Sequence, residues 1–192
     1  GAVFPLETTW TGNVDNDWYD NGNWSICAPD MNVSALIPAG VTNFPTIGAA
    51  GAECNDLSME SSTSLIDNGF LTIYGGLTAE RLLTGGTTKD DPNAIYHLVS
   101  SPVQSIDGYD IFDSATFVRV WIESNQNWGN LVGPGSNLVP GRGYASWSQA
   151  GDETISFFGS LNTGNIPSFP LYYTPTAPNA TLIGYNMVGN PY

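Results

Sequence analysis

The chain has 192 residues, enough for one domain or two small ones, and its 18 acidic and 4 basic residues give a formal net charge of -14. This charge repels nucleic acid and anionic lipid headgroups, and no run approaches the ~20 apolar residues of a membrane span, so we expect neither nucleic-acid binding nor membrane insertion. Only 11% of the residues are charged, against about a quarter in typical soluble domains. Asn, Ser, Thr and Gly must therefore provide solubility, as is typical of an extracellular surface.

The first informative segment, residues 9–47, is rich in Trp, Asn, Asp and Gly. Within it, Asp15, Asp17 and Asp20 offer oxygen ligands beside Gly22, in the sort of loop that wraps calcium. The segment lacks both the spacing of an EF-hand and its distal bidentate Glu. The pattern predicts either a calcium site on these three carboxylates or an Asx-rich turn in which the same side chains cap their own backbone.

The chain contains two cysteines, Cys27 and Cys54. An even number of cysteines in a chain of extracellular composition predicts a disulfide between them, which would stabilise the fold by about 3 to 3.5 kcal/mol. The alternative is a pair of buried free thiols. Zinc is not expected, because two Cys without a nearby His do not supply four ligands.

Apolar residues occur in short runs broken by Gly, Pro, Asn and Asp at intervals of roughly 8 to 12 residues, which predicts an all-β fold. One stretch, 77–83, has some helical spacing, but it is short and is followed at once by Gly85 and Gly86. The predicted strands cover residues 33–37, 56–60, 70–74, 95–99, 117–123, 143–147, 154–158 and 182–188.

Residues 84–94 form the best candidate boundary, because they are polar, carry two Gly and a Pro, and include Lys89, the only Lys. We place a first region at 1–88 and a second at 89–192. Ahead of the boundary, residues 54–76 have the pattern of β-solenoid rungs or a tight meander, with Asn68 and Gly69 in a turn. After the boundary we expect an antiparallel β-sandwich.

Two segments of the second region echo each other, namely YHLVSSP at 96–102 and YNMVGNP at 185–191. Both alternate polar and apolar residues and end in a Pro that cannot donate to a ladder, which predicts two strands of one design. The only His in the chain, His97, corresponds to Asn186. A position that accepts either side chain is expected to hold a hydrogen-bonding strand residue rather than a catalytic base.

Four motifs follow one another in the second region: HLVSSP at 97–102, GRGY at 141–144, FGSLNTG at 158–164 and VGNPY at 188–192. Together with the Trp-rich first segment, this order resembles a repeat in secreted surface proteins of the Bacteroidetes, including adhesin-like substrates of the type IX secretion system. The resemblance implies an extracellular, cell-surface location and adhesive or structural work. It also implies a parent protein that continues past Tyr192. Separately, Asp113, Ser114 and Ala115 resemble the Asp-Ser/Thr-apolar O-glycosylation motif of the Bacteroidetes, with Ser114 as the acceptor.

The sequence offers little evidence of a catalytic motif. No Gly-x-Ser-x-Gly elbow is present. A glycosidase needs only two carboxylates, and the candidates are the acidic group Asp107, Asp110, Asp113, Glu123 and Glu153. Carboxylates on a polar surface are usually solvated, so glycoside hydrolysis is the third of three expected functions.

Six Trp and nine Tyr indicate sugar binding, because an exposed aromatic ring stacks on a pyranose. Trp18, Trp24 and Trp128 are the stacking candidates, although most aromatic side chains should lie in the core. We expect first a non-enzymatic secreted surface protein for adhesion or extracellular structure, with a polysaccharide or a surface protein as partner. The second expectation is a carbohydrate-binding module of a larger secreted protein. A row of exposed aromatics would favour the module, and buried aromatics with open strand edges would favour the structural role.

The exposed edges of the predicted sheets must be protected by something other than lysines. Natural sheets often protect exposed edges with Lys, but this chain has one Lys, in the predicted boundary. We expect the edges to be closed by Pro, bulges and loops, or by a strand from an adjacent domain or another copy.

Overall fold

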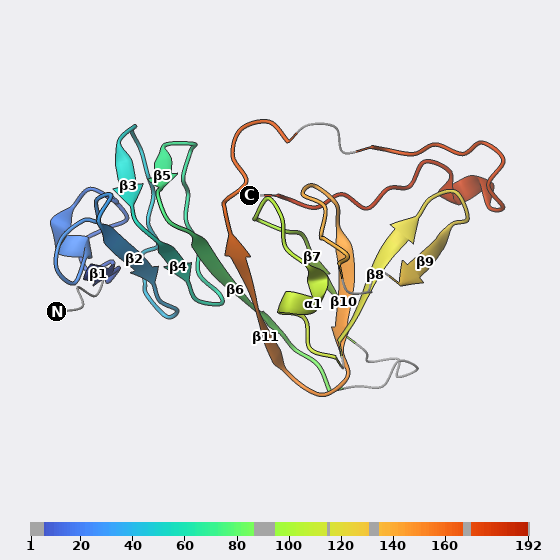
Figure 1. The fold of residues 1–192 in the computed structure, drawn as a ribbon, viewed down its shortest axis with the longest axis horizontal. Helices are drawn as coiled ribbons and strands as arrows, with labels where there is room; N and C mark the ends of the chain where they lie inside the picture. Colours follow the sequence, from blue (N-terminus) through green and yellow to red (C-terminus); the bar gives the residue numbers. More distant parts are fainter. Residues whose placement is uncertain (1–5, 87–94, 115, 131–134, 167–169, 192) are drawn as a thin grey trace. The chain divides into compact units, whose positions relative to one another are not determined.

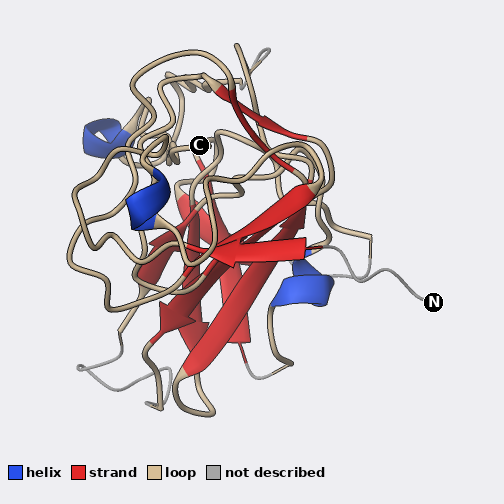
Figure 2. Ribbon diagram, turned by 90° about the vertical axis from the view of Figure 1, so that its left-hand side faces the viewer, coloured by secondary structure: helices blue, strands red, loops and turns tan. Residues whose placement is uncertain are grey.

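The computed structural model describes residues 6–86, 95–114, 116–130, 135–166 and 170–191. The fold is nearly all β, as predicted (Figures 1 and 2). Its helices are single turns, and none in the described residues is long and apolar enough to cross a membrane. The chain divides into two compact units. Unit 1 comprises Gly1–Leu82 and Ser156–Leu161, and unit 2 comprises Leu83–Ile155 and Asn162–Tyr192. The predicted boundary at residues 88 and 89 lies outside the described residues.

Unit 1 is a parallel β-coil. Its main sheet has the strand order β1-β2-β4-β6-β11, which are β1 (Leu6–Thr9), β2 (Val33–Ile37), β4 (Leu57–Met59), β6 (Leu77–Leu83) and β11 (Glu153–Gly159). The first four pair in parallel, and a second parallel pair joins β3 (Ala52–Cys54) to β5 (Leu71–Ile73). Isolated parallel bridges join Asp17 to Thr46 and Thr46 to Ile66. The chain therefore returns to each side after roughly 20 residues, the period of a solenoid rather than of a meander.

The interior of the coil follows from strand alternation. Successive strand side chains point to opposite faces, so every second residue enters the coil. The buried apolar residues of these coils include Val33, Ala35, Ile37, Ile47, Ala52, Cys54, Leu57, Leu71 and Leu77. The predicted turn before β5 is present, with Asn68 and Gly69 at φ 56 and 79, the left-handed conformations that a type I′ turn requires.

Three tryptophans of the first segment form one aromatic cluster. The rings of Trp10 and Trp18 each meet Trp24 edge to face, at centroid distances of 5.0 and 4.8 Å. All three side chains are buried, and Trp24 Nε1 donates to the carbonyl of Trp18 at 2.8 Å. Because a solenoid must cover the end of its core, we interpret this cluster as the apolar filling of the first coil.

Unit 2 contains the predicted antiparallel sheet. The strand order is β7-β10-β8-β9, which are β7 (His97–Val99), β10 (Tyr144–Ser148), β8 (Thr116–Ile122) and β9 (Asn127–Asn130). All five residues of β10 are buried. Among the described residues of unit 2, no second sheet packs on this one. Its remaining core comes from α1 (Gly108–Ile111) and from loops, through Val103, Ile106, Ile111, Phe112 and Leu138.

Several local patterns are overridden by tertiary pairing. Residues 77–83, which have helical spacing, form the strand β6 between β4 and β11. The predicted strand at 182–188 is wrong: a 3-10 helix spans Ala180–Leu182, and only an isolated bridge joins Val188 to Arg142. The strands β1, β3 and β9 were not predicted, because these segments, LETT, AEC and NWGN, contain few apolar residues.

Replacing Trp24 by Ala should destabilise unit 1 by about 3 to 5 kcal/mol, because it empties the space between two other indoles. Urea unfolding followed by circular dichroism measures the change. The matched control is Trp128→Ala, which removes a side chain that is 39% exposed and should change the free energy of unfolding much less. Equal effects of the two substitutions would contradict the buried cluster.

Candidate functional site

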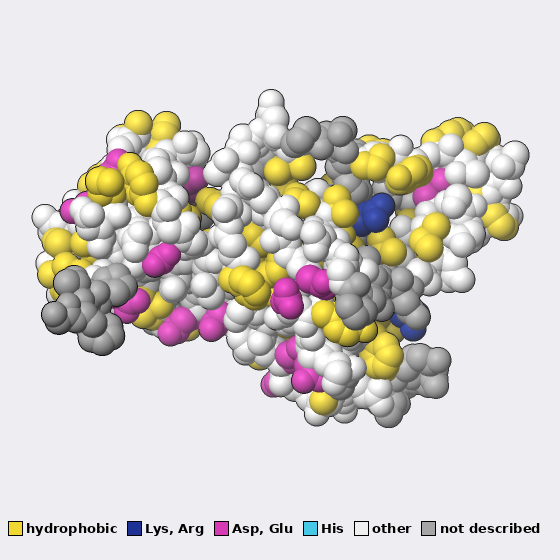
Figure 3. Space-filling view, in the orientation of Figure 1, with side chains coloured by type: hydrophobic (Ala, Val, Ile, Leu, Met, Phe, Trp, Pro, Cys, Tyr) yellow, Lys and Arg dark blue, Asp and Glu magenta, His cyan; other side chains and the backbone are white. Residues whose placement is uncertain are grey.

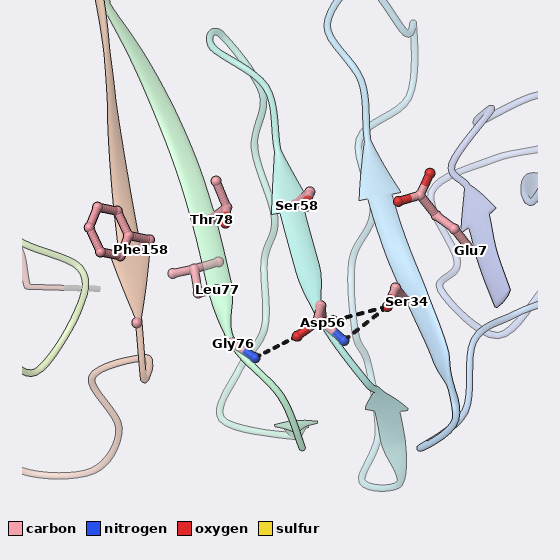
Figure 4. A pocket seen from close by; sticks show the side chains of 9 residues that line it. Glu7, Ser34, Asp56, Ser58, Gly76, Leu77, Thr78 and Phe158 are labelled. Carbon is pink, nitrogen blue, oxygen red and sulfur yellow. Dashed lines mark hydrogen bonds between the residues drawn. The ribbon is translucent and has the colours of Figure 1, made fainter. Parts of the chain in front are cut away.

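A depression of about 410 Å³ lies on the outer face of the main sheet of unit 1 (Figure 4). Five different strands or strand ends contribute side chains to it. Its lining residues are Glu7, Ser34, Asp56, Ser58, Gly76, Leu77, Thr78, Phe158 and Gly159. These positions are far apart in the sequence, and the pairing of the strands in the main sheet brings them together.

The floor of the depression is a row of hydrogen-bonded residues on adjacent strands. The backbone N–H of Gly76 donates to Asp56 Oδ1 at 2.8 Å, and the Ser34 hydroxyl donates to Asp56 Oδ2 at 3.3 Å. The Asn55 amide also donates to Oδ2 at 3.3 Å. Asp56 therefore joins three successive coils. Figure 4 shows this row running across β2, β4 and β6.

A second group of polar side chains stands around this floor. Glu7 and Thr78 are exposed and Ser58 is half-buried, and none of the three makes a side-chain hydrogen bond within the described residues. Phe158 adds an aromatic ring that is 47% exposed. The depression thus combines one uncommitted carboxylate, two uncommitted hydroxyls and an aromatic face.

Two carboxylates, Glu7 and Asp56, line the depression, and a glycosidase also needs two. A hydrolase needs one carboxyl that gives a proton and another that acts as base or nucleophile. Asp56 accepts hydrogen bonds from a backbone amide and a hydroxyl of the framework, so it acts as a bridge between coils. Of the two lining carboxylates, Asp56 is thus part of the framework and Glu7 stands outside it.

The predicted calcium ligands do not converge. The described residues contain no group of three His, Cys, Asp or Glu side chains placed to hold a metal. Instead, Asp15, Asp17 and Asp20 accept the backbone N–H of Asp17, Tyr19 and Gly22, respectively, in Asx turns. Buried Asn23 organises the loop: its Oδ1 accepts from Val14 and Asp15, and its Nδ2 donates to Asp15. The alternative reading, turns that cap their own backbone, describes this loop.

Two of the three predicted stacking tryptophans, Trp18 and Trp24, are only 1% and 5% exposed, so that prediction is corrected for both. Trp128 is exposed on β9 and meets Trp121 of β8 edge to face, with ring centroids 5.6 Å apart. The Trp121 Nε1 donates to the carbonyl of Tyr185 at 2.8 Å. A Cβ on the neighbouring Gly184 would come within 3.3 Å of the Tyr173 ring. We call Trp121, Trp128, Tyr173 and Tyr185 the aromatic surface of unit 2.

The predicted disulfide is absent, since Cys27 and Cys54 are both free thiols. Cys54 points into the coil from β3 and is fully buried, whereas Cys27 lies half-buried in the loop before β2. Burial, together with the charge of Asp56, raises the pKa of Cys54 to about 12. The strand alternation that buries Cys54 holds its thiol in the core.

Three more of the candidates, His97, Asp107 and Glu153, make hydrogen bonds within unit 2. His97 Nε2 lies 3.0 Å from the carbonyl of Thr84, which can only accept, so this nitrogen carries the hydrogen. Asp107 caps α1 by accepting from Tyr109, and Glu153 accepts from the Asp113 amide and the Thr116 hydroxyl. Ser114 is exposed in a turn, while Ala115 of its motif lies outside the described residues.

Glu123 is buried at the end of β8 and anchors a distant segment. Its carboxylate accepts the backbone N–H and hydroxyl of Thr174 and the N–H of Gly184, each N–H at 2.9 Å. These donors, first the Thr174 hydroxyl and then the Gly184 amide, hold the pKa of Glu123 below its ordinary value. Glu123 therefore acts as a structural anion.

Sequence reasoning missed the role of Asn162, which joins the motifs of the second region. The side-chain amide of this buried residue donates to the carbonyls of Ser101 and Pro191 at 2.9 and 2.8 Å, and its backbone N–H donates to Pro102 at 2.9 Å. Nearby, the N–H of Gly189 donates to Gly141. Asn162 of the third motif therefore bonds to the first and the fourth, which overlap the two copies of the internal echo, and Gly189 links the fourth motif to the second.

Comparison of the chain with protein families, curated proteins and solved structures finds no match.

Acid should loosen the segment that Glu123 anchors. Because the folded pKa is lowered, the stabilisation is complete above the ordinary carboxyl pKa and is lost as the pH falls through the lowered value. Hydrogen exchange at the Thr174 and Gly184 amides, corrected for its intrinsic pH dependence, should show protection falling once the pH drops below the ordinary Glu pKa of about 4.3. Glu123→Gln should remove this acid-dependent step. The same profile in both proteins would contradict the assignment.

Asn162→Asp should destabilise unit 2 by about 2 to 4 kcal/mol, because a carboxylate oxygen then faces two carbonyls that lose their donor. Urea unfolding measures the loss, and limited proteolysis should cut residues 185–191 faster. Asn125→Asp, in an exposed turn, adds the same charge as a control and should have little effect. A stability equal to that of the control would refute the joining role.

Proposed function

We propose that this chain is a non-enzymatic secreted surface protein that serves adhesion or builds an extracellular structure. The observation that carries the proposal is the hydrogen-bond linkage of the four motifs, three of them through Asn162 and the other through Gly189. These motifs are the residues that resemble the repeat of Bacteroidetes surface proteins, and they act here through backbone hydrogen bonds and close packing. A motif set used in this way supports a repeated structural module rather than a reaction centre.

The use of the acidic side chains supports the same proposal. Asp56 bridges coils, Asp107 caps a helix and Glu123 anchors a segment. Each accepts hydrogen bonds from the chain itself, so these three carboxylates are framework groups. Open strand edges add a route to assembly: within the described residues, β1 pairs only with β2 and β9 only with β8.

The proposal is tested on intact cells of the producing organism. Antibodies to the chain should label the surface of unpermeabilised cells, and protease added outside should remove the label. In parallel, the purified chain should release no reducing ends from a polysaccharide panel. Labelling that requires permeabilisation, or steady hydrolysis that an acidic substitution abolishes, would overturn the proposal.

The aromatic surface of unit 2 favours a second candidate, a carbohydrate-binding module. Trp128, Tyr173 and Tyr185 are all exposed, and large exposed aromatics on neighbouring segments are a cost unless they meet a partner. The edge-to-face geometry of Trp121 and Trp128 leaves them out of one plane, so they do not form a flat platform. This candidate therefore ranks second.

If the module reading holds, Trp128→Ala should abolish co-sedimentation with an insoluble polysaccharide that the unmodified chain binds, because it removes an exposed aromatic ring of that surface. Tyr74→Ala removes a similarly exposed ring in unit 1 and is the matched control. Binding that survives Trp128→Ala would exclude the aromatic surface as the binding site.

A further inference from the structure

We propose that the depression on the main sheet of unit 1 binds a neutral polysaccharide chain, with Phe158 as stacking platform and Glu7, Ser58 and Thr78 as hydrogen-bond partners. The inference rests on the proposed adhesive function and names the ligand class of that adhesion. It concerns a different surface from the aromatic surface of unit 2.

The floor of the depression is preorganised. Asp56 receives hydrogen bonds from Ser34 and Gly76 on the strands at either side, so the row that underlies the depression is held by bonds across the strands. Ser34 is only 7% exposed. A floor fixed before binding loses little conformational freedom when a ligand arrives, which favours binding of a weakly interacting chain.

The uncommitted groups around the floor match the chemistry of a saccharide. Glu7 accepts, and the hydroxyls of Ser58 and Thr78 both donate and accept, as sugar hydroxyls do. Register places Ser58 opposite Thr78, on strands that lie about 4.8 Å apart. Figure 4 shows Phe158 on the neighbouring strand β11, where its half-exposed ring offers a flat apolar face for a pyranose.

Charge restricts the kind of saccharide. The depression is lined by two carboxylates and by no Lys, Arg or His. Uronate or sulfated polymers would place their charges beside Glu7 and Asp56 in a chain of net charge -14, which costs free energy. A neutral polymer avoids this repulsion, and its hydroxyls supply donors to Glu7.

A peptide is a less suitable occupant. Extended peptides usually bind by adding a strand to an open sheet edge. The floor of the depression lies on β2, β4 and β6, which are interior strands paired on both sides. Only a basic peptide, attracted by Glu7, would compete, and its binding would weaken steeply with salt.

Titration calorimetry on the full 192-residue chain tests the proposal with four soluble probes: cellohexaose, mannohexaose, an oligogalacturonate and an oligolysine. We expect at least one neutral hexasaccharide to bind, with little dependence on salt, and the oligogalacturonate not to bind. Phe158→Ala should weaken binding by about tenfold, because it removes the stacking face.

Thr78→Val keeps the shape of the side chain but removes its hydroxyl, and it should weaken binding by roughly threefold. This variant preserves the test if Phe158→Ala disturbs the fold, which circular dichroism will show. Trp128→Ala, in unit 2, should bind like the unmodified chain.

The proposal is overturned if neither neutral sugar binds, if only the oligogalacturonate or the oligolysine binds, or if Phe158→Ala and Thr78→Val keep full affinity. Loss through Trp128→Ala alone would also overturn it, by moving the site to unit 2. None of these results bears on surface labelling of intact cells, so the proposed function fails or stands separately.

Discussion

Short polar side chains that hydrogen-bond to the backbone stabilise each of the two units internally. Strand ends and tight turns leave N–H and C=O groups without ladder partners, and a buried group of this kind is costly unless it is paired. Asn23 accepts hydrogen bonds from backbone N–H groups of the first loop, and Asp56 joins three coils. Asn162 joins the segments around residues 101 and 191. A chain with few charges and many Asn and Asp residues is suited to this work. The same composition makes such residues resemble ligands for calcium or groups for catalysis when only the sequence is read.

The strands could be predicted from the sequence where a short stretch of residues carries the apolar pattern by itself. The strand at 33–37 was predicted with the bounds it has, because four apolar residues, interrupted by Ser34 alone, lie between Asn32 and Pro38. The solenoid character of the first region was also predictable, since its rungs recur within a short stretch. Residues 77–83 show the limit: their spacing is helical, but pairing with β4 and β11 makes them a strand. The second layer of unit 2 could not be read from strand patterns, because loops and α1 supply it.

The candidate site was beyond sequence reasoning for a related reason. Glu7, Asp56 and Phe158 are separated by most of the chain, and only the register of the sheet makes them neighbours. The tryptophans show the opposite problem. Trp18, Trp24 and Trp128 stand in similar polar surroundings in the sequence, but two are buried against each other and one is exposed. Local composition does not distinguish an indole that fills a coil from one that faces water.

Unit 1 is built from two separate parts of the chain, and this affects how it folds while the protein is synthesised. Its main sheet ends in β11, and residues 84–152 of unit 2 separate β11 from β6 in the chain. Translation delivers the N-terminal coils first, so the outer edge of β6 has no neighbour until the ribosome has passed residue 159. A nascent chain with an open strand edge is a target for unwanted pairing. Export in an unfolded state, or a chaperone that covers β6, would protect the chain during that interval.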